Sequence, residues 1–266
     1  MRRITLLTDF GTRDGYVGAM KGVLASAAPG VPLDDITHDV AHGDIRGAGY
    51  ALLRYWDRFP ERTVHVAVVD PGVGTRRRPM AVRVKDRFLV LPDNGLGCGV
   101  LSQAPGWQAV SLEPKQVGVE VPSTTFHGRD LFAPAAARLA MGTPLADLGP
   151  ALEDPVRLQE PALHDEGGRV RGEVVEVDRF GNLLTNIPGE RARQGASVRV
   201  EVEGREIPFL TTYGAVKPGK PLALVSSDGR VEVAVRDGSA AEDLGLGVGA
   251  RVMVEGVPRG PEVVDP

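Results

Sequence analysis

The strongest constraint on the fold of this chain is a nearly unbroken apolar run at residues 64–69, "VHVAVV". A strand with apolar side chains at successive positions has no face for water, so other elements must cover both of its faces. Strands of this kind are typical of parallel sheets that carry helices on both sides. The run therefore favours an α/β architecture.

The rest of the first half repeats a strand–loop–helix order. "RITLLTD" precedes "GYVGAMKGVLASAAPG", whose helical spacing stops at the chain-breaking pair Pro29 and Gly30. "PLDDITH" precedes "DIRGAGYALLRYWDRFP" in the same way, and "GRDLFAPAAARLAMG" supplies a further helix. We therefore predict an α/β domain with a largely parallel sheet over residues 1–152.

The second half has a different pattern. Short alternating segments such as "EVVEVD", "NLLTNI", "SVRVEVEG" and "RVEVAV" are separated by Gly, Pro and Asp turns, with almost no helical periodicity. This pattern predicts a smaller antiparallel β domain over residues 169–266. Between the two halves, residues 153–168 are rich in proline and acidic residues and are expected to form a linker.

Composition narrows the classes of partner and location. A net charge of −4 gives no general attraction to nucleic acid or to an anionic membrane surface, so we expect neither partner. The single cysteine cannot form an internal disulfide, no stretch is long and apolar enough to span a membrane, and the first residues have too few apolar side chains for a signal peptide. We therefore expect a cytoplasmic protein that acts on a small metabolite.

Three acidic residues follow predicted strands: Asp9 in "TDFGT", Asp70 in "DPGVGTRRR" and Asp93 in "PDNG". Each could simply cap the next helix or turn, which is a common role for aspartate. However, ligands gather at the carboxyl ends of parallel strands, and all three loops contain glycine. Together they favour a shared site, while the absence of a phosphate-binding glycine motif disfavours a nucleoside triphosphate.

The histidines divide into structural and functional candidates. His65 lies inside the apolar run and is expected to be a core residue with a satisfied side chain. His38 and His42, in "THDVAHGD", have the appearance of metal ligands, but no further histidine or cysteine completes a set at recognisable spacing, so no metal is predicted. His127, in "STTFHGRD", precedes a predicted helix and is a candidate for a side chain that projects from a loop into a site.

The motifs "TDFGT", "DPGVGTRRR", "PDNG", "TFHGRD" and "DRFGNLLTNI" occur in this order along nearly the whole chain. This set resembles the S-adenosyl-L-methionine (SAM) hydroxide adenosyltransferases, or SAM hydrolases, which are relatives of the SAM-dependent fluorinases and chlorinases. The resemblance implies an α/β domain, a C-terminal β-barrel-like domain and a homotrimer. It also implies that SAM lies where the first domain of one subunit meets the second domain of its neighbour.

The reaction implied by the resemblance is hydrolysis of SAM to adenosine and L-methionine by attack of water at C5′. Methionine leaves as a neutral thioether and needs no general acid, whereas water, with a pKa of about 15.7, needs a cation and a base. The family's catalytic set falls on Asp70, Arg77 and His127, with Arg76 and Arg78 as alternatives for the arginine. SAM is then a substrate, no cofactor or metal is expected, and either Asp70 or His127 could accept the proton.

The resemblance also implies roles in substrate binding. Asp9 would bind the ribose hydroxyls and Ser227 the methionine carboxylate, although Asp228 stands here where the fluorinases have arginine. The remaining expected contacts are with the sugar, the base and the methionine amino group, and they come from Asn94, Thr125, Phe126, Asp178, Phe180 and Asn182.

Two other functions are consistent with the same pocket. A SAM-dependent halogenase is disfavoured, because the fluorinases replace the aspartate and histidine positions of Asp70 and His127 with tyrosines and carry a longer insertion at the short "VKDRF" link. A non-catalytic SAM- or adenosine-binding protein would hold the ligand without turning it over.

Overall fold

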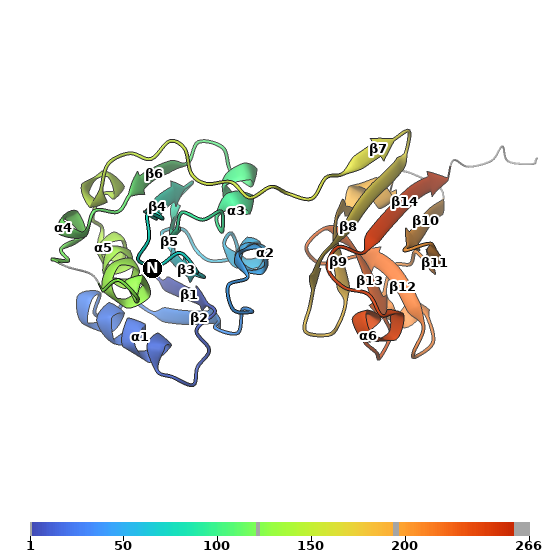
Figure 1. Cartoon of the computed structure of the whole chain (residues 1–266), viewed down its shortest axis with the longest axis horizontal. Helices are drawn as coiled ribbons and strands as arrows, with labels where there is room; N and C mark the ends of the chain where they lie inside the picture. Colours follow the sequence, from blue (N-terminus) through green and yellow to red (C-terminus); the bar gives the residue numbers. More distant parts are fainter. Residues whose placement is uncertain (1, 121–122, 194–196, 258–266) are drawn as a thin grey trace, which may run out of the picture. The chain divides into compact units, whose positions relative to one another are not determined.

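The computed structural model describes residues 2–120, 123–193 and 197–257. The chain divides into two compact units, Met1–Leu158 and Gln159–Pro266 (Figure 1). This division falls inside the segment 153–168 that the sequence predicts to be a linker.

The first unit is built on a sheet in the order β2-β1-β3-β5-β4-β6. Parallel pairing joins β1 to β2, β1 to β3 and β3 to β5, whereas β4 runs antiparallel to β5 and to β6. The sheet is therefore mixed but largely parallel, which confirms the predicted α/β class. Its strands are β1 (Ile4–Thr8), β2 (Leu33–Thr37), β3 (Val64–Val68), β4 (Pro79–Val84), β5 (Arg87–Pro92) and β6 (Gln108–Ser111).

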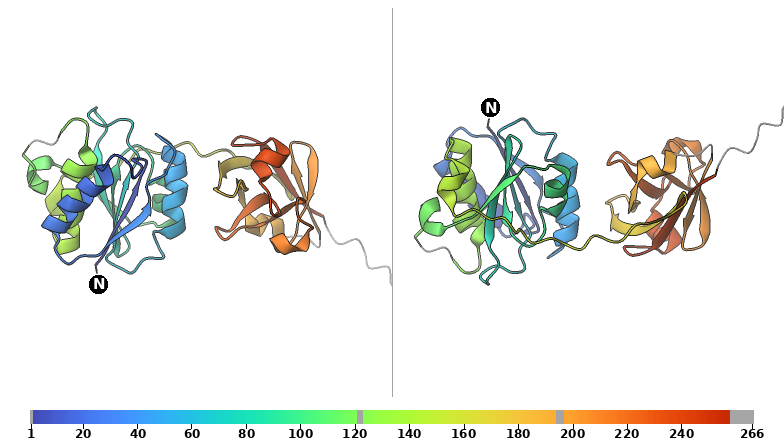
Figure 2. Two further views of the ribbon diagram at one scale, coloured as in Figure 1. Left: turned by 90° about the horizontal axis from the view of Figure 1, so that it is seen from below. Right: turned by 90° about the horizontal axis from the view of Figure 1, so that it is seen from above.

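Helices cover both faces of this sheet (Figure 2). One hydrophobic cluster packs side chains of α1 and α5 against the sheet, and a second packs side chains of α2 and α3 against its other face. All five residues of β1 and all five of β3 are buried, as expected for strands without a solvent face. The helices are α1 (Tyr16–Ala27), α2 (Ile45–Tyr55), α3 (Cys98–Gln103), α4 (Pro114–Val117) and α5 (Ala133–Met141).

The second unit is an antiparallel sheet in the order β11-β10-β14-β8-β9-β13-β12, with β7 paired to β8. The sheet is nearly closed, because a bridge joins Phe209 to Ala223 and the Leu210 N–H donates to the Ala223 carbonyl at 2.8 Å. The predicted β-barrel-like domain is thus confirmed. Its strands are β7 (His164–Glu166), β8 (Arg169–Val177), β9 (Leu183–Pro188), β10 (Ser197–Val202), β11 (Arg205–Pro208), β12 (Pro221–Val225), β13 (Arg230–Val235) and β14 (Arg251–Val257).

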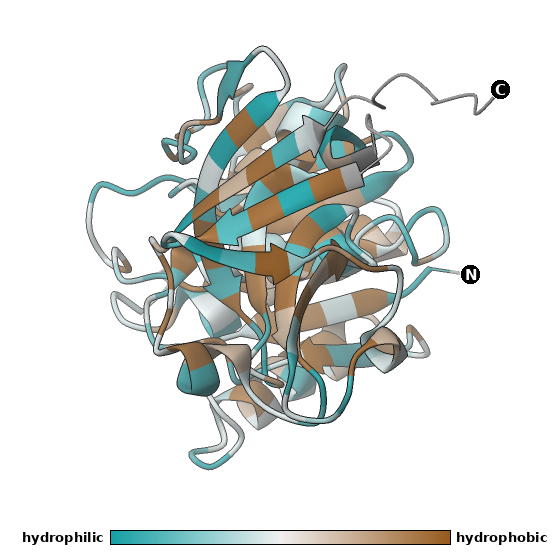
Figure 3. Ribbon diagram, turned by 90° about the vertical axis from the view of Figure 1, so that its right-hand side faces the viewer, coloured by the Kyte–Doolittle hydropathy of each residue, from teal (hydrophilic) through white to brown (hydrophobic). Residues whose placement is uncertain are grey.

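Alternation of side chains along these strands explains why a single sheet can curve around one core. Hydrophobic and hydrophilic residues alternate along the strands of this unit (Figure 3). In β10, Val200 and Val202 are buried while Arg199, between Val198 and Val200, is exposed. One face of the curved sheet therefore encloses the core and the other meets solvent.

Two local features differ from the sequence prediction. Helix α6 (Ala240–Leu244) lies in the half where almost no helical pattern is visible, and five residues are too few to display a period. The Ser239 hydroxyl caps this helix by accepting from the Glu242 N–H at 3.2 Å. In addition, β7 lies inside the segment expected to be a linker, where it pairs with β8.

Among the described residues, no helix is both long enough and apolar enough to cross a membrane.

Candidate active site

Parallel pairing of β1 and β3 brings the loops that follow them to one edge of the sheet. Thr8 pairs with Val68, so Asp9 and Asp70 leave neighbouring strands at the same edge. Both aspartate side chains are almost completely buried, at 6% and 5% exposure. A buried carboxylate needs charged or hydrogen-bonding partners, and these define the site.

Arg77 is the partner of Asp70. Its Nε donates to Asp70 Oδ1 at 3.0 Å, and its Nη2 donates to Asp70 Oδ2, so the guanidinium engages both carboxylate oxygens. The side chains of Arg77 and Asp70 are 7% and 5% exposed, which makes this a buried ion pair. Of the three consecutive arginines, the middle one thus pairs with Asp70, whereas Arg76 is exposed and Arg78 pairs with other acids.

The loop that carries Arg77 packs directly on the loop that carries His127. Gly74 has φ +75°, and a Cβ built there would lie 2.2 Å from the Thr124 carbonyl oxygen. Only glycine permits this conformation together with this close approach. The tight bend of "DPGVGT" is therefore needed to bring the two loops together.

His127 stands immediately before a widened helical turn, Gly128–Phe132, that leads into α5. The Ala133 N–H donates to the Gly128 carbonyl, five residues back, in place of the usual four. Such π-type turns occur frequently at functional sites, because they change the direction of the side chains beside them.

A contact between Arg77 and His127 fixes the protonation of the imidazole. Arg77 Nη2 lies 3.1 Å from His127 Nδ1. Because a guanidinium has only donors, Nδ1 must accept and the proton of the neutral ring is on Nε2. Burial, and then the positive charge of Arg77, lower the pKa of His127 below its ordinary value, so the neutral ring is favoured.

One nitrogen of Arg77 is left without a partner. Nη1 is buried, and no described residue accepts a hydrogen bond from it. Phe132 lies beside the guanidinium, with its ring centroid 5.5 Å from Arg77 Cζ. An unpartnered buried N–H is costly, and ordered water or a functional role is among the explanations for such a group in native proteins.

Asp9 is held by the loop between β2 and α2. Its Oδ2 accepts from the Gly43 N–H at 2.9 Å and lies 3.4 Å from His42 Nδ1. His38, by contrast, contacts the Thr8 hydroxyl at 2.8 Å through Nδ1 and Asp35 at 3.1 Å through Nε2. The two histidines of "THDVAHGD" thus contact different residues. The described ranges contain no group of three or more His, Cys, Asp or Glu placed to hold a metal.

An aromatic cluster, which the sequence motifs did not reveal, lies next to His127. Phe10, Tyr16 and Phe126 pack edge to face, with centroids 5.2 to 6.3 Å apart. Tyr16 is half exposed, and Thr125 is exposed beside Phe126. Only the position of Phe10 in "TDFGT" and of Phe126 in "TFHGRD" could have indicated this cluster.

Asp93 and Asn94 have structural partners. Asp93 accepts from Arg78 Nε at 2.8 Å and from the Val156 N–H at 2.7 Å, so it ties the end of the first unit to the sheet. Asn94 donates to the Val69 carbonyl at 2.8 Å and accepts from the Leu96 N–H at 3.2 Å. Asp93 therefore does not belong to the Asp70–Arg77 cluster, contrary to the shared site of three acids expected from the sequence.

In the second unit, Asp178 organises the turn between β8 and β9. Its Oδ1 accepts from the Phe180 N–H at 2.8 Å and the Asn182 N–H at 2.9 Å, and its Oδ2 accepts from Asn182 Nδ2 at 3.0 Å. This is a tight side-chain-to-backbone turn. It leaves the Phe180 ring 76% exposed and available to a ligand.

Ser227 lies exposed in the turn between β12 and β13. The next residue, Asp228, lies 3.3 Å from Arg230 Nη2, and Glu176 lies 3.8 Å from the same nitrogen. Arg230 therefore lies between two carboxylates, Asp228 of this turn and Glu176 of β8.

Comparisons with known proteins match both units. The family model described as the SAM hydroxide adenosyltransferase N-terminal domain matches residues 4–149, and that of the C-terminal domain matches residues 172–253. This chain belongs to the SAM hydroxide adenosyltransferase family.

Individual relatives agree with this assignment. A curated "(R)-S-adenosyl-L-methionine hydrolase" of Salinispora tropica is 44% identical over 94% of this chain and 97% of its own length. A protein of the same name from Thermus thermophilus is 43% identical over 95% of this chain and 99% of its own. A fluorinase of an Actinoplanes species is 28% identical over 94% of this chain and 96% of its own, so the halogenating relatives are more distant.

Two solved structures have the same fold. A protein of Thermotoga maritima, described as an uncharacterized conserved protein, matches with a TM-score of 0.87 and 36% identity over 94% of this chain and 99% of its own. A conserved hypothetical protein of Thermus thermophilus matches with a TM-score of 0.80 and 42% identity over 96% of this chain and 100% of its own.

Proposed function

We propose that this protein hydrolyses SAM to adenosine and L-methionine by attack of water at C5′ of the adenosyl group. The observation that carries the proposal is the buried Asp70–Arg77–His127 cluster, in which one guanidinium N–H has no partner among the described residues, in a chain of this family. The names of the relatives that match over nearly the whole chain support the same reaction.

In this proposal Arg77 stabilises the hydroxide character that develops on water. Asp70 and His127 hold the guanidinium from two sides, so its orientation is set before substrate binds. Nη1, which has no partner among the described residues, would donate to the water oxygen. Because methionine leaves as a neutral thioether, no group is needed to protonate it.

We assign the role of proton acceptor to Asp70. His127 Nδ1 accepts from Arg77, and the Nε2 of the neutral ring carries a proton, so neither nitrogen has a lone pair for the proton of water. Each oxygen of Asp70 keeps a further lone pair after its hydrogen bond with Arg77. His127 is then a donor that orients the water.

Substrate binding is proposed for both units. Asp9 would bind the ribose hydroxyls, with Asn94, Thr125 and Phe126 near the sugar and the nucleophile. From the second unit Asp178 would bind the methionine amino group, Asn182 and Phe180 the adenine, and Ser227 the methionine carboxylate. We further propose a homotrimer in which the two units that form one site come from neighbouring subunits, and a cytoplasmic location.

The test is product analysis after incubation with SAM. We expect adenosine and methionine in equal amounts, at the same rate in chloride-rich and chloride-free buffer and with or without EDTA. Formation of 5′-chloroadenosine would establish a halogenase instead. Recovery of intact SAM from the protein after hours would establish the non-catalytic binding protein, and loss of activity with EDTA that zinc or magnesium restores would contradict the metal-free mechanism.

A further inference from the structure

A pocket of about 500 Å³ lies in the first unit at the edge of the sheet opposite to Asp9 and Asp70. Arg2 stands just before β1 and Arg62 just before β3, so the pocket lies at the amino ends of the two strands whose carboxyl ends lead to those aspartates. A five-residue strand extends about 16 Å, which keeps the two sites apart.

Positive charge converges on this pocket. Its lining residues include three arginines, Arg2, Arg62 and Arg83, and one carboxylate, that of Asp86. Arg83 Nη2 pairs with Asp86 at 3.3 Å, while Arg2 donates to the Ala140 carbonyl at 2.9 Å. Within the described ranges the Arg62 guanidinium has no hydrogen bond or ion pair. Arg2 and Arg62 therefore both lack a carboxylate partner among the described residues, and only Arg83 of the three arginines has one.

The backbone at Arg62 is in a conformation that non-glycine residues rarely adopt. Its φ is +65°, and its N–H donates to the Asp86 carbonyl at 2.6 Å. Lys85, beside Asp86, also has a positive φ of +52°. The φ of Lys85 belongs to the two-residue turn between β4 and β5, whereas Arg62 lines the pocket, and residues in such conformations tend to cluster at ligand sites.

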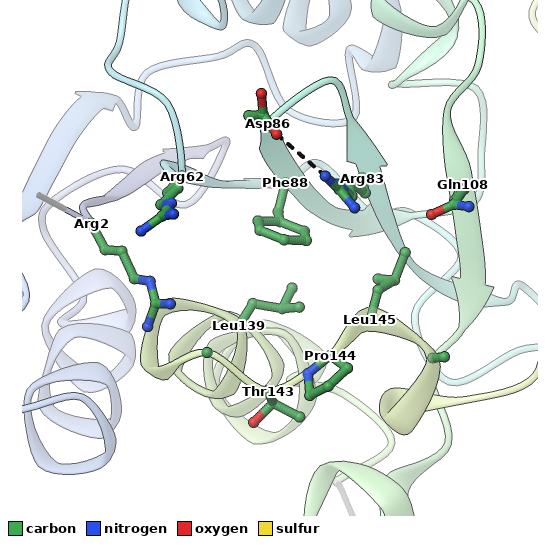
Figure 4. A pocket seen from close by; sticks show the side chains of 12 residues that line it. Arg2, Arg62, Arg83, Asp86, Phe88, Gln108, Leu139, Thr143, Pro144 and Leu145 are labelled. Atoms are coloured by element: carbon green, nitrogen blue, oxygen red, sulfur yellow. Dashed lines mark hydrogen bonds and ion pairs between the residues drawn. The ribbon is translucent and has the colours of Figure 1, made fainter.

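An apolar floor lies between the arginines. Figure 4 shows the Phe88 ring and Leu139 between Arg2 and Arg62 on one side and Arg83 and Gln108 on the other. Guanidinium groups bind phosphate through paired N–H donors, and an aromatic ring binds a flat apolar group. The volume suits a small organic molecule rather than a bare ion.

We propose that this pocket binds a small phosphate ester whose apolar part lies on Phe88 and Leu139, as a second ligand site separate from the candidate active site. The phosphate would lie between Arg62 and the neighbouring guanidinium groups. This site is independent of the reaction proposed above, so either assignment can fail without the other.

The test is calorimetric titration of the full chain with phenyl phosphate, with inorganic phosphate and phenol titrated separately. We expect saturable binding of one phenyl phosphate per chain, and affinities at least about tenfold lower for inorganic phosphate and for phenol, since each lacks half of the contacts. Arg62→Gln and Arg83→Gln should each weaken phenyl phosphate binding by about tenfold or more. Arg62 is exposed, so its variant should keep the wild-type melting temperature.

Two controls make the result decisive. Arg58→Gln removes the same charge at an exposed position of the first unit outside the pocket, and Arg77→Lys alters the candidate active site; both should keep wild-type affinity. An equal loss in Arg58→Gln would reduce the effect to general electrostatics, and a loss in Arg77→Lys would place the ligand in the other site. Either of these two results would overturn the proposal. So would the absence of saturable binding, or an affinity for inorganic phosphate equal to that for phenyl phosphate.

Discussion

Arg77 is the residue on which the geometry of the candidate active site depends, because it contacts both Asp70 and His127. We predict that Arg77→Lys lowers the single-turnover rate of SAM hydrolysis by about 100-fold, since a single ammonium group cannot reproduce the two-pronged contact or present a second N–H to water.

The matched control is Arg76→Lys, which makes the same change at the exposed neighbouring position and should leave the rate within about twofold of wild type. The rate is measured at saturating SAM, so that weaker binding does not contribute. If Arg77→Lys changes SAM affinity alone and leaves the single-turnover rate intact, Arg77 is a binding residue.

His127 supplies a second prediction at the residue scale. Burial and the positive charge of Arg77 lower the pKa of His127 in the folded protein, so its ring stays neutral to a lower pH than that of an unperturbed histidine. In an NMR titration the ring proton signal of His127, assigned by its loss in His127→Gln, should have a midpoint below about pH 6.5. Any loss of hydrolysis caused by protonation of His127 should accordingly have its midpoint below about pH 6.5. A midpoint of the NMR titration above about pH 6.5 would contradict the contact between His127 and Arg77.

At the scale of elements, the contact between the loop after β3 and the loop before α5 is set by Gly74. We predict that Gly74→Ala lowers hydrolysis by about tenfold or more, because the added methyl would lie 2.2 Å from the Thr124 carbonyl and must displace the loop next to His127. Gly106→Ala is the control: its φ is +84°, but nothing lies within 4 Å of the added Cβ.

Both glycine variants should lose about 1 kcal/mol of stability from the left-handed backbone alone. Only Gly74→Ala should lose activity in addition. Equal activity of the two variants would mean that loop packing at Gly74 does not position the catalytic groups.

Much of the element-level structure could be predicted from the sequence. Apolar runs without alternation predicted the buried strands of the first unit, and alternation predicted the barrel-like second unit. The bend at Asp70 and the loop position of His127 were also visible as motifs. These features depend on local patterns, which the sequence carries directly.

The remaining features depend on contacts between distant segments. Three strand ends carry an acid, but Asp93 pairs with Arg78 and the segment at Val156, because β5 is followed by a loop that meets the end of the first unit. Likewise, Phe10, Tyr16 and Phe126 form one cluster only because α1 and α5 pack side by side. No spacing rule along the chain predicts such pairings.

At the scale of the whole molecule, the buried His65 couples the stability of the first unit to pH. Burial, the largest cause, lowers its pKa to about 3, and inside the core it contacts the Thr5 hydroxyl at 2.8 Å. Between about pH 6.5 and 3 the unfolded chain binds a proton that the folded chain excludes, so stability falls as pH falls, by at most about 1.4 kcal/mol per unit from this group.

We predict that the midpoint of urea unfolding is lower at about pH 5 than at about pH 7.5. Tryptophan fluorescence reports on unfolding of the first unit, because both tryptophans, Trp56 and Trp107, lie in it. His65→Gln should reduce this difference between the two pH values, whatever its effect on absolute stability. His164→Gln, at an exposed position of the second unit, should leave the difference unchanged. An unaltered difference in His65→Gln would show that other groups cause the acid sensitivity.

The proposed sharing of one site between subunits is a property of the assembly and needs a test at that scale. Asp9 and Asp178 belong to different units. Asp9→Asn and Asp178→Asn remove a charge and keep an oxygen that can accept from the backbone N–H groups now bound to each aspartate. We predict that each variant alone has little activity.

Mixed oligomers of the two variants distinguish the two arrangements of the site. If a site pairs the first unit of one subunit with the second unit of the next, random mixing in equal amounts restores about one quarter of the wild-type sites, because that fraction of neighbouring pairs joins two intact units. If each site lies within one chain, every site keeps one lesion and mixing restores nothing. Subunit exchange is verified by mass spectrometry of the intact oligomers, so an absence of recovery after verified exchange would place the whole site in a single chain.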